Sequence, residues 1–295
     1  MRPTTTAPTE TAAPDGELTV AAAPLERWHE VVGWTAEEGW NPGDDDISSF
    51  HAADPDGFFL GRRGGRTVSA LSLVNYSEDY AFLGFYLVAP GLRGQGLGLA
   101  TWRAAFPHVG ARTVGLDAVP AQEATYRRAG FTAAHDTLRY TGRPTPGARP
   151  SPDTHPVTAA HHDAIAAFDR RCFPADRREF VTRWLTTPGR TARVRLRDGE
   201  VVGYGVLRPA ESGYRIGPLF ADTPETAEAL FDALTAQLDP ADEVTLDVPE
   251  PNAAARTLAT ARGLTPRSHT IRMYTGPVPP VAAGRTFGVT SLELG

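Results

Sequence analysis

The sequence contains no lysine, a single cysteine and no long apolar run. All 29 basic residues are arginine, which excludes a Walker-type phosphate loop because that loop needs a lysine. The lone Cys172 excludes an internal disulfide and fits a reducing compartment; we interpret it as a structural thiol. No segment reaches the ~20 apolar residues of a membrane span, and residues 1–16 lack the apolar core of a secretory signal. We therefore expect a soluble cytoplasmic protein with no membrane partner, beginning with a disordered tail over residues 1–16.

The net charge of −6 is confined to the first half of the chain. Residues 1–141 hold 11 arginines and 17 acidic residues, whereas residues 142–295 are balanced. This distribution disfavours a nucleic-acid partner and mildly favours a cationic small molecule, although an acidic surface that serves solubility explains the charge equally well. The use of arginine alone, with abundant alanine, proline and glycine, indicates a GC-rich bacterial genome.

A stretch rich in proline and glycine, GRPTPGARPSPDTHP at residues 142–156, divides the chain and predicts a linker. Landmarks on its two sides recur at nearly constant spacing. Gly65 and Gly199 are 134 positions apart, as are Tyr80 and Tyr214, while Gly130 and Gly263 are 133 apart. We interpret residues 17–141 and 157–295 as two copies of one fold.

Each copy shows the pattern helix, helix, three antiparallel strands, helix, strand, helix, strand. Paired apolar runs around Gly64-Gly65 and around Asp198-Gly199 predict β-hairpins. The expected helices are 23–33, 46–52, 98–106, 121–129, 158–170, 176–186, 224–238 and 252–262. This order predicts the α+β class, with a mixed, mostly antiparallel sheet flanked by helices in each copy.

A glycine-rich turn follows the apolar strand 81–90 and precedes a helix: GLRGQGLG at residues 91–98. Such a turn directs free N–H groups and the positive end of the helix dipole at one point, which suits a phosphate. Gly94, Gly96 and Gly98 would let the backbone approach the anion, and Arg93 could add a charged fork. A Rossmann fingerprint fits poorly because Leu99 stands at its third glycine, and a turn without any ligand is a further alternative.

The run Arg93-Gly94-Gln95-Gly96-Leu97-Gly98 resembles the acetyl-CoA loop of the GNAT acyltransferases, Gln/Arg-x-x-Gly-x-Gly/Ala. AQEATYRRAGF at residues 121–131 resembles the late helix of that family, and residues 39–59 resemble a bacterial two-copy GNAT subgroup. The resemblance implies two tandem GNAT-like domains, with acetyl-CoA bound as co-substrate by the first. No metal is implied.

The glycine loop occurs only once. At the matching place the second copy reads GYRIGPLFADTPETAEAL, where Pro218, Asp222, Pro224 and Glu225 replace the glycines and the arginine. Acidic side chains repel a pyrophosphate, so we interpret residues 157–295 as a degenerate domain that stabilises the pair. The sequence leaves open whether this domain also lines the acceptor pocket.

The resemblance also assigns candidate catalytic roles. It implies that the pantetheine arm lies along Leu87 and Val88, with a backbone N–H near Val88 facing the thioester carbonyl. It further implies that the Tyr126 hydroxyl protonates the departing thiolate; a packing tyrosine is the alternative, which Ala259 at the matching place of the second copy disfavours.

The base is less well defined. Glu78 and Asp79 precede the cofactor strand and are candidates, although both suit an ordinary turn. Asp117 ends a strand beside the cleft, but Asp247 repeats it in the second copy, which favours a structural role.

The resemblance to the GNAT family also implies that the acceptor site lies between the first two helices. Glu38 and Trp40 combine an acidic group with an aromatic face, which suits an ammonium, and Asp44 to Asp46 are either part of that site or a solvated loop. His161-His162-Asp163 could suggest a metal, but adjacent histidines diverge on a helix and favour a helix surface.

These features predict an acetyl-CoA-dependent N-acetyltransferase that acts directly, without a covalent intermediate, on the primary amine of a small and cationic acceptor. A non-catalytic acyl-CoA sensor and a protein lysine or N-terminal acetyltransferase are the alternatives. The protein is expected to be a monomer or homodimer.

Overall fold

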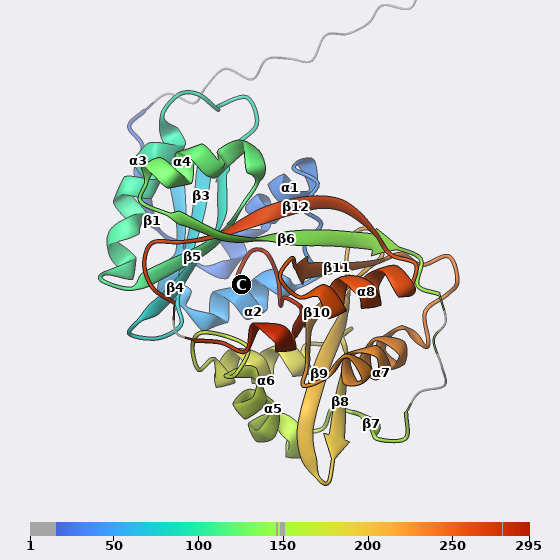
Figure 1. Ribbon diagram of the computed structural model, residues 1–295. Helices are drawn as coiled ribbons and strands as arrows, with labels where there is room; N and C mark the ends of the chain where they lie inside the picture. Colours follow the sequence, from blue (N-terminus) through green and yellow to red (C-terminus); the bar gives the residue numbers. More distant parts are fainter. Residues whose placement is uncertain (1–15, 146, 148–150, 279) are drawn as a thin grey trace, which may run out of the picture.

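The computed structural model describes residues 16–145, 147, 151–278 and 280–295. Its described strands form one continuous 13-stranded sheet flanked by helices (Figure 1). The strands are β1 (Thr19–Ala22), β2 (Phe58–Arg63), β3 (Arg66–Asn75), β4 (Tyr80–Val88), β5 (Thr113–Ala118), β6 (Thr132–Gly142), β7 (Thr154–Pro156), β8 (Thr191–Arg197), β9 (Glu200–Pro209), β10 (Tyr214–Ala221), β11 (Val244–Pro249), β12 (Thr265–Tyr274) and β13 (Thr286–Gly288). This α+β architecture confirms the predicted fold class.

The helices repeat in the same order in both halves of the chain. They are α1 (His29–Glu37), α2 (Asp46–Ala53), α3 (Leu97–Ala105), α4 (Glu123–Arg128), α5 (His162–Asp169), α6 (Arg178–Thr186), α7 (Pro224–Thr235) and α8 (Ala253–Ala261). Short 3₁₀ helices accompany them at Leu25–Arg27, Pro55–Gly57, Phe106–Val109, Pro120–Gln122, Ala159–His161 and Ala283–Arg285. Seven of the eight predicted helices are confirmed to within a few residues.

The predicted helix 23–33 is wrong in its bounds. Its first part is a 3₁₀ turn and its second part, α1, continues through Gly33 to Glu37. The helix ends instead near Gly39, whose φ of +69° is the left-handed conformation that commonly follows a helix C-terminus. Gly33 lies inside α1 and does not end it.

Both predicted hairpins are confirmed. The turn between β2 and β3 has positive φ at Gly64 (+54°) and Gly65 (+78°), and the turn between β8 and β9 has it at Asp198 (+53°) and Gly199 (+82°). Two consecutive positive φ values are the requirement of a type I′ turn, whose twist matches that of the strands it joins.

The two copies exchange their last long strands. β6 of the first half pairs with β11 of the second, β12 of the second half pairs with β5 of the first, and β6 and β12 pair with each other. Figure 1 shows β6 and β12 side by side across the middle of the molecule. Each copy is therefore closed by a strand from the other, which the two-domain prediction did not contain.

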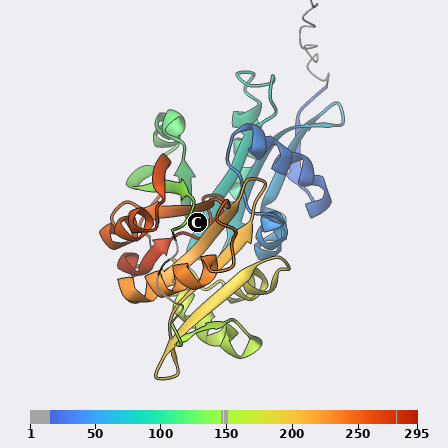
Figure 2. The ribbon, with the colours of Figure 1, turned by 90° about the vertical axis from the view of Figure 1, so that its right-hand side faces the viewer.

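The buried apolar side chains form one cluster shared by both copies and further clusters within each copy. One apolar cluster joins the early helices of both halves, with Phe50 of α2 stacked 5.5 Å from Trp184 of α6. Separate clusters lie beneath α7 and α8 in the second half and beneath α3 and α4 in the first. The side view in Figure 2 shows both halves joined as one body, with the β8–β9 hairpin (yellow) pointing away from the first half.

The predicted linker, residues 142–156, is partly structured. Gly142 is the last residue of β6 and Thr154–Pro156 forms β7, while 146 and 148–150 lie outside the described residues. The expected tail lies outside them as well, except for Gly16. Among the described residues no helix is both long and apolar enough to cross a membrane.

Candidate active site

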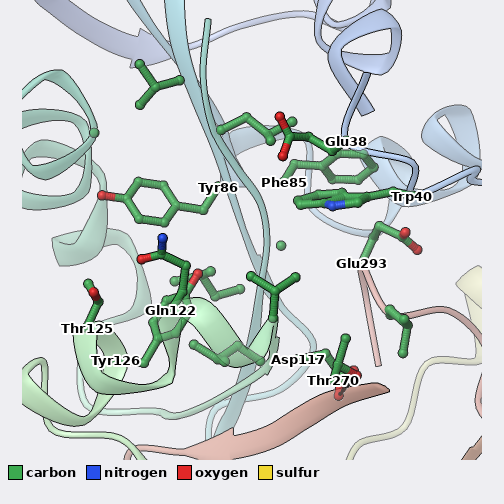
Figure 3. Close-up of a pocket in the computed structure, with 18 of the residues that line it drawn as sticks. Glu38, Trp40, Phe85, Tyr86, Asp117, Gln122, Thr125, Tyr126, Thr270 and Glu293 are labelled. Atoms are coloured by element: carbon green, nitrogen blue, oxygen red, sulfur yellow. Dashed lines mark hydrogen bonds between the residues drawn. The ribbon is translucent and has the colours of Figure 1, made fainter. Parts of the chain in front are cut away.

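A cavity of about 710 Å³ opens where β4 and β5 separate. These strands pair in parallel only as far as Leu83 and Leu116, so the backbone beyond those residues is free to line the cavity. Figure 3 shows Tyr126 and Gln122 on one side of it and Trp40 and Glu293 on the other. The cavity brings together most of the predicted site residues: Glu38, Trp40, Leu87, Val88, Arg93, Gly94, Gly96, Gly98 and Tyr126.

A β-bulge shapes the wall of the cavity. Gly84 pairs with Ser72 and Leu87 with Ala70, so β4 contains one residue more than β3 at this point. Phe85 adopts a φ of +46°, which is unusual for a bulky residue and typical of functional sites. A bulge leaves backbone groups unpaired, and the pantetheine path along Leu87 and Val88 begins here.

The glycine loop presents an open helix N-terminus. Gly96 caps α3 with φ +78°, and no side chain accepts a hydrogen bond from the first turn. Gly94 has φ +77°, and a methyl group built on Gly94 or on Gly96 would meet no atom within 4 Å. The loop therefore has the uncapped N–H groups and the open face that a pyrophosphate requires. Gln95 and Leu97 do not line the cavity; Gln95 is exposed and Leu97 is buried beneath the loop.

Gly98 has a different role from the other two glycines. A methyl group at this position would lie 2.9 Å from the Tyr86 hydroxyl and 3.1 Å from Val88 Cγ2. Gly98 thus allows β4 to pack closely against the start of α3. Burial raises the pKa of Tyr86, which keeps its hydroxyl a hydrogen-bond donor beside the loop.

Arg93 and Glu38 form an ion pair across the mouth of the cavity. The Arg93 side chain is 55% exposed, so the pair adds little stability. It does join the predicted phosphate-binding residue to the predicted acceptor-binding residue, and a phosphate at the loop would compete with Glu38 for the guanidinium.

Trp40 is held in place by strands of both copies. Arg139 of β6 donates a hydrogen bond to the Trp40 carbonyl at 2.9 Å, and Arg215 of β10 donates one to the same oxygen at 3.2 Å. Asn41 is paired with the backbone of Ser212 in both directions, at 2.9 and 3.1 Å. The loop that carries the indole ring is therefore docked on β6 of the first copy and on residues of the second copy.

Tyr126 lies on α4 and is 9% exposed, with its ring packed against Trp102 and Phe131. Burial raises its pKa strongly, and the neighbouring Tyr86 adds to this effect. The hydroxyl therefore remains protonated throughout the pH range of an ordinary assay. Burial therefore places the phenol pKa of Tyr126 well above that of an ordinary thiol.

The structure does not bring Glu78 and Asp79 to the cavity. Both are exposed in the turn before β4, whereas the lining of the cavity begins at Leu83. The nine residues of β4 span about 30 Å, which separates this turn from Val88. Their position does not support the predicted role as base. They adjoin the first residue of β4 in sequence, whereas the cavity lies toward the other end of that strand.

Asp117 and Asp247 hold the exchanged strands. Asp117 on β5 accepts two hydrogen bonds from Arg272 of β12, at 3.0 and 2.7 Å. Asp247 on β11 accepts two from Arg139 of β6, at 2.8 and 3.0 Å. These contacts agree with the structural role expected for Asp117 and Asp247. Asp46 is also structural: it is 1% exposed and paired with Arg190 and Arg208, which corrects its interpretation as acceptor site or solvated loop.

Two features occupy the matching place in the described part of the second copy. Thr223 caps α7 by accepting a hydrogen bond from the Thr226 N–H, and bonding to a backbone N–H at this helix start lowers the pKa of Glu225. In addition, β13 pairs with β10 and contacts β11, and so occupies the gap that corresponds to the cavity between β4 and β5. The predicted loss of the phosphate site therefore has a clear structural basis.

Several lining residues were missed by the sequence analysis. Gln122 and Thr125 come from the late helix region of the first copy, while Ser268, His269, Thr270, Leu292 and Glu293 come from the second copy. Only Gln122 and Thr125 could have been found, by their spacing from Tyr126 on one helix. Ser268, His269 and Thr270 depend on the strand exchange, whereas Leu292 and Glu293 depend on the route of the segment that follows β13.

Two minor candidates take no part in the site. Burial raises the pKa of the Cys172 thiol to about 12, which makes it unreactive. His161 caps its own helix by accepting a hydrogen bond from the Thr158 N–H at 3.1 Å. In the part of the chain that the structure describes, no three histidine, cysteine or acidic side chains are grouped as a metal site would require.

Comparison with known families agrees with this geometry in both halves. Residues 25–131 match the model described as the acetyltransferase (GNAT) family, and residues 165–288 match the model described as an acetyltransferase (GNAT) domain. The chain belongs to the GNAT acyltransferases and is a tandem member with two copies of the fold.

Individual relatives support the same assignment. The chain is 34% identical over 273 residues to a holothin acyltransferase from Pseudoalteromonas sp., which covers 92% of this chain and 93% of that protein. The fold resembles that of a candidate acetyltransferase from Pyrococcus horikoshii, with a TM-score of 0.79 and 19% identity over 94% of this chain and 96% of the other. It also resembles a tandem GNAT protein from the clavulanic acid biosynthesis pathway, with a TM-score of 0.60 and 17% identity over 88% and 99% of the two chains.

Proposed function

We propose that the protein transfers an acetyl group from acetyl-CoA directly to the amine of a small acceptor, and that the first copy does the chemistry. The observation that carries this proposal is the uncapped N-terminus of α3 behind the open faces of Gly94 and Gly96, at the mouth of the cavity that Tyr126 lines. A glycine turn of this kind suits a pyrophosphate, and the gap between β4 and β5 suits a narrow pantetheine arm.

The path of the thioester is expected to follow β4. With the diphosphate on the loop, the arm passes Val88 and Leu87 toward the bulge at Phe85. Backbone N–H groups at the bulge would then face the thioester carbonyl and stabilise negative charge on its oxygen. This role requires no side chain, which agrees with the apolar character of that part of the wall.

Tyr126 is proposed to donate the proton that the departing sulfur needs. The Tyr126 side chain lines the cavity. Its raised pKa keeps the proton in place until the thiolate forms. Both the phenolate and the thiolate would lose hydration in this buried region, which raises the pKa of the phenol and of the thiol alike. Proton transfer from Tyr126 to the sulfur therefore remains feasible.

The acceptor is proposed to be a small molecule rather than a protein. A cavity of about 710 Å³ lies in the range of small-molecule sites. The Trp40 loop and the segment Ser268–Thr270 close it from two sides, and the Arg93–Glu38 pair crosses its mouth. A long open peptide groove would need these elements to move apart. The relative named a holothin acyltransferase makes holothin one acceptor to test.

The test is a screen for amine-dependent CoA release from acetyl-CoA across alkylamines, arylamines, amino acids, aminoglycosides and holothin. We expect turnover with at least one small amine and none with lysine-containing peptides. A protein that binds acetyl-CoA but releases no CoA with any amine would favour the sensor alternative instead.

A further inference from the structure

The segment that follows β12 takes an unexpected route through the molecule. Residues 286–288 form β13 in the second copy, and residues 292 and 293 line the cavity of the first copy. Most side chains of residues 286–295 are buried. One short segment thus connects the filled gap of the degenerate copy with the open gap of the other.

Anchoring in the second copy is extensive. The Asn252 side chain donates to the Thr286 carbonyl at 2.9 Å, the Val289 N–H donates to the Asp247 carbonyl at 2.9 Å, and Phe287 is 1% exposed. A methyl group on Gly217, in the bulge of β10, would lie 2.4 Å from the Thr290 carbonyl oxygen. The segment therefore occupies the place where a thioester would lie in an active copy.

In the first copy the same segment reaches the bulge of β4. A methyl group on Gly84 would lie 2.0 Å from the carbonyl oxygen of Glu293, so the two backbones are in direct contact. The Tyr76 hydroxyl donates to the Leu294 carbonyl at 3.2 Å, and the Leu294 side chain is fully buried. These contacts fix Glu293 beside Phe85, where the thioester carbonyl is expected.

Glu293 itself is a buried carboxylate with spare hydrogen-bonding capacity. It is 4% exposed, it lines the cavity opposite Tyr126 (Figure 3), and its Oε2 has no hydrogen-bond partner within the described residues. A buried carboxylate oxygen without a partner is costly. A polar ligand at this position would supply the missing donor.

Two arginines lie near Glu293. Arg139 and Arg215 interact with it electrostatically, although neither forms an ion pair with it among the described residues. They share the carboxylate of Asp247 instead. Oε2 of Glu293 is left with free lone pairs among the described residues, which a general base needs in order to accept a proton.

We propose that Glu293, supplied by the segment anchored in the degenerate copy, is the general base that takes the proton from the acceptor nitrogen. This inference rests on the proposed function. The second copy would then contribute a catalytic residue, and both copies would form the acceptor site.

The step balances as follows. Glu293 accepts one proton from the acceptor ammonium, and the neutral nitrogen forms a C–N bond with the thioester carbon. The C–S bond breaks, Tyr126 gives its proton to the sulfur, and the second nitrogen proton restores the phenol. The products are the amide and CoA thiol, and Glu293 releases its proton to solvent.

The test compares Glu293→Gln with wild type on two probe amines, benzylamine and aniline. Benzylamine is protonated at neutral pH and aniline is not, so only benzylamine must lose a proton before attack. We expect kcat/KM for benzylamine to fall by about 10²–10⁴-fold and that for aniline to fall much less, with acetyl-CoA affinity unchanged by calorimetry. Glu243→Gln, an exposed glutamate of the second copy, is the matched control.

Equal losses for the two amines, or a loss under threefold for both, would overturn the role of Glu293. If wild type uses neither amine, the slow hydrolysis of acetyl-CoA provides the readout, because water would then stand in for the acceptor nitrogen. Hydrolysis that falls in Glu293→Gln supports the base even where the proposed amine acceptor fails, whereas unchanged hydrolysis counts against it. The experiment therefore distinguishes a failure of the proposed amine acceptor from a failure of Glu293 as the base.

Discussion

Arg139 and Asp247 form a buried bidentate ion pair although they belong to different copies of the repeat. Nε lies 2.8 Å from Oδ1 and Nη2 lies 3.0 Å from Oδ2. Arg139 is on β6, the strand that the first copy contributes to the sheet of the second, and it also bonds the Trp40 carbonyl. One side chain thus connects the strand exchange to the wall of the active site.

Loss of this carboxylate should destabilise the whole protein. Asp247→Asn would leave Arg139 and Arg215 buried without their counter-charge, and breaking such a pair from one side costs about 3–5 kcal/mol. Denaturant unfolding at neutral pH measures this loss. Asp163→Asn, which removes a carboxylate that is 92% exposed, should change the free energy of unfolding very little.

The same pair predicts how stability depends on pH. Burial alone would raise the pKa of Asp247, but Arg139 and Arg215 outweigh it and hold the pKa below its usual value. A carboxylate with a lowered pKa in the folded state stabilises above its unfolded pKa of about 4, and loses that contribution as pH falls through the folded value. Wild type should therefore lose stability in acid over a range where Asp247→Asn loses less. Parallel acid profiles for the two proteins would contradict this assignment.

The glycine loop is tested by two nearly isosteric substitutions. Gly96→Asp places a carboxylate where the pyrophosphate is expected, whereas Gly96→Asn adds the same bulk without charge and tolerates the positive φ. We expect the aspartate variant to lose acetyl-CoA binding and the asparagine variant to bind more weakly than wild type but measurably. If calorimetry gave equal acetyl-CoA affinities for the two variants, the pyrophosphate would not bind at Gly96.

Tyr126→Phe should lower kcat by about 10²–10⁴-fold while leaving the acetyl-CoA affinity nearly unchanged. The ring that packs against Trp102 is retained, so a thermal melt should show an intact fold. Because burial raises the Tyr126 pKa, wild type should show no alkaline loss of kcat from this residue within the assay range. Tyr214→Phe, outside the cavity, is the control. A Tyr126→Phe enzyme within threefold of wild type would reject the acid role.

Cys172 should be inert in the native protein. Its thiol is 7% exposed, and burial raises its pKa to about 12. Iodoacetamide at mildly alkaline pH is expected to label it only after denaturation, with no loss of activity before that point. Rapid labelling of the native enzyme, detected by mass spectrometry, would show that the turn after α5 opens.

The features that could be predicted from the sequence are local ones. The type I′ turns at Gly64-Gly65 and Asp198-Gly199, and the open loop at Gly94 and Gly96, are determined by residues a few positions apart. Their backbone requirements can be deduced from residue type alone, and the repeat spacing extends them to the second copy.

The features that could not be predicted depend on contacts between distant segments. The exchange of β6 and β12 leaves the order of elements unchanged, so no spacing reveals it. Glu293 reaches the cavity only because β13 enters the gap beside β10. Glu78 was chosen for its nearness to β4 in sequence, yet that strand extends away from it.

The most direct test of the division between the copies is the number of acetyl-CoA molecules bound per chain. Calorimetric titration of the wild type should give one site, because the loop of the first copy is open whereas α7 is capped and β13 fills the second gap. Gly96→Asp should reduce that number to zero. Two sites per chain, or one site that survives Gly96→Asp, would contradict the account.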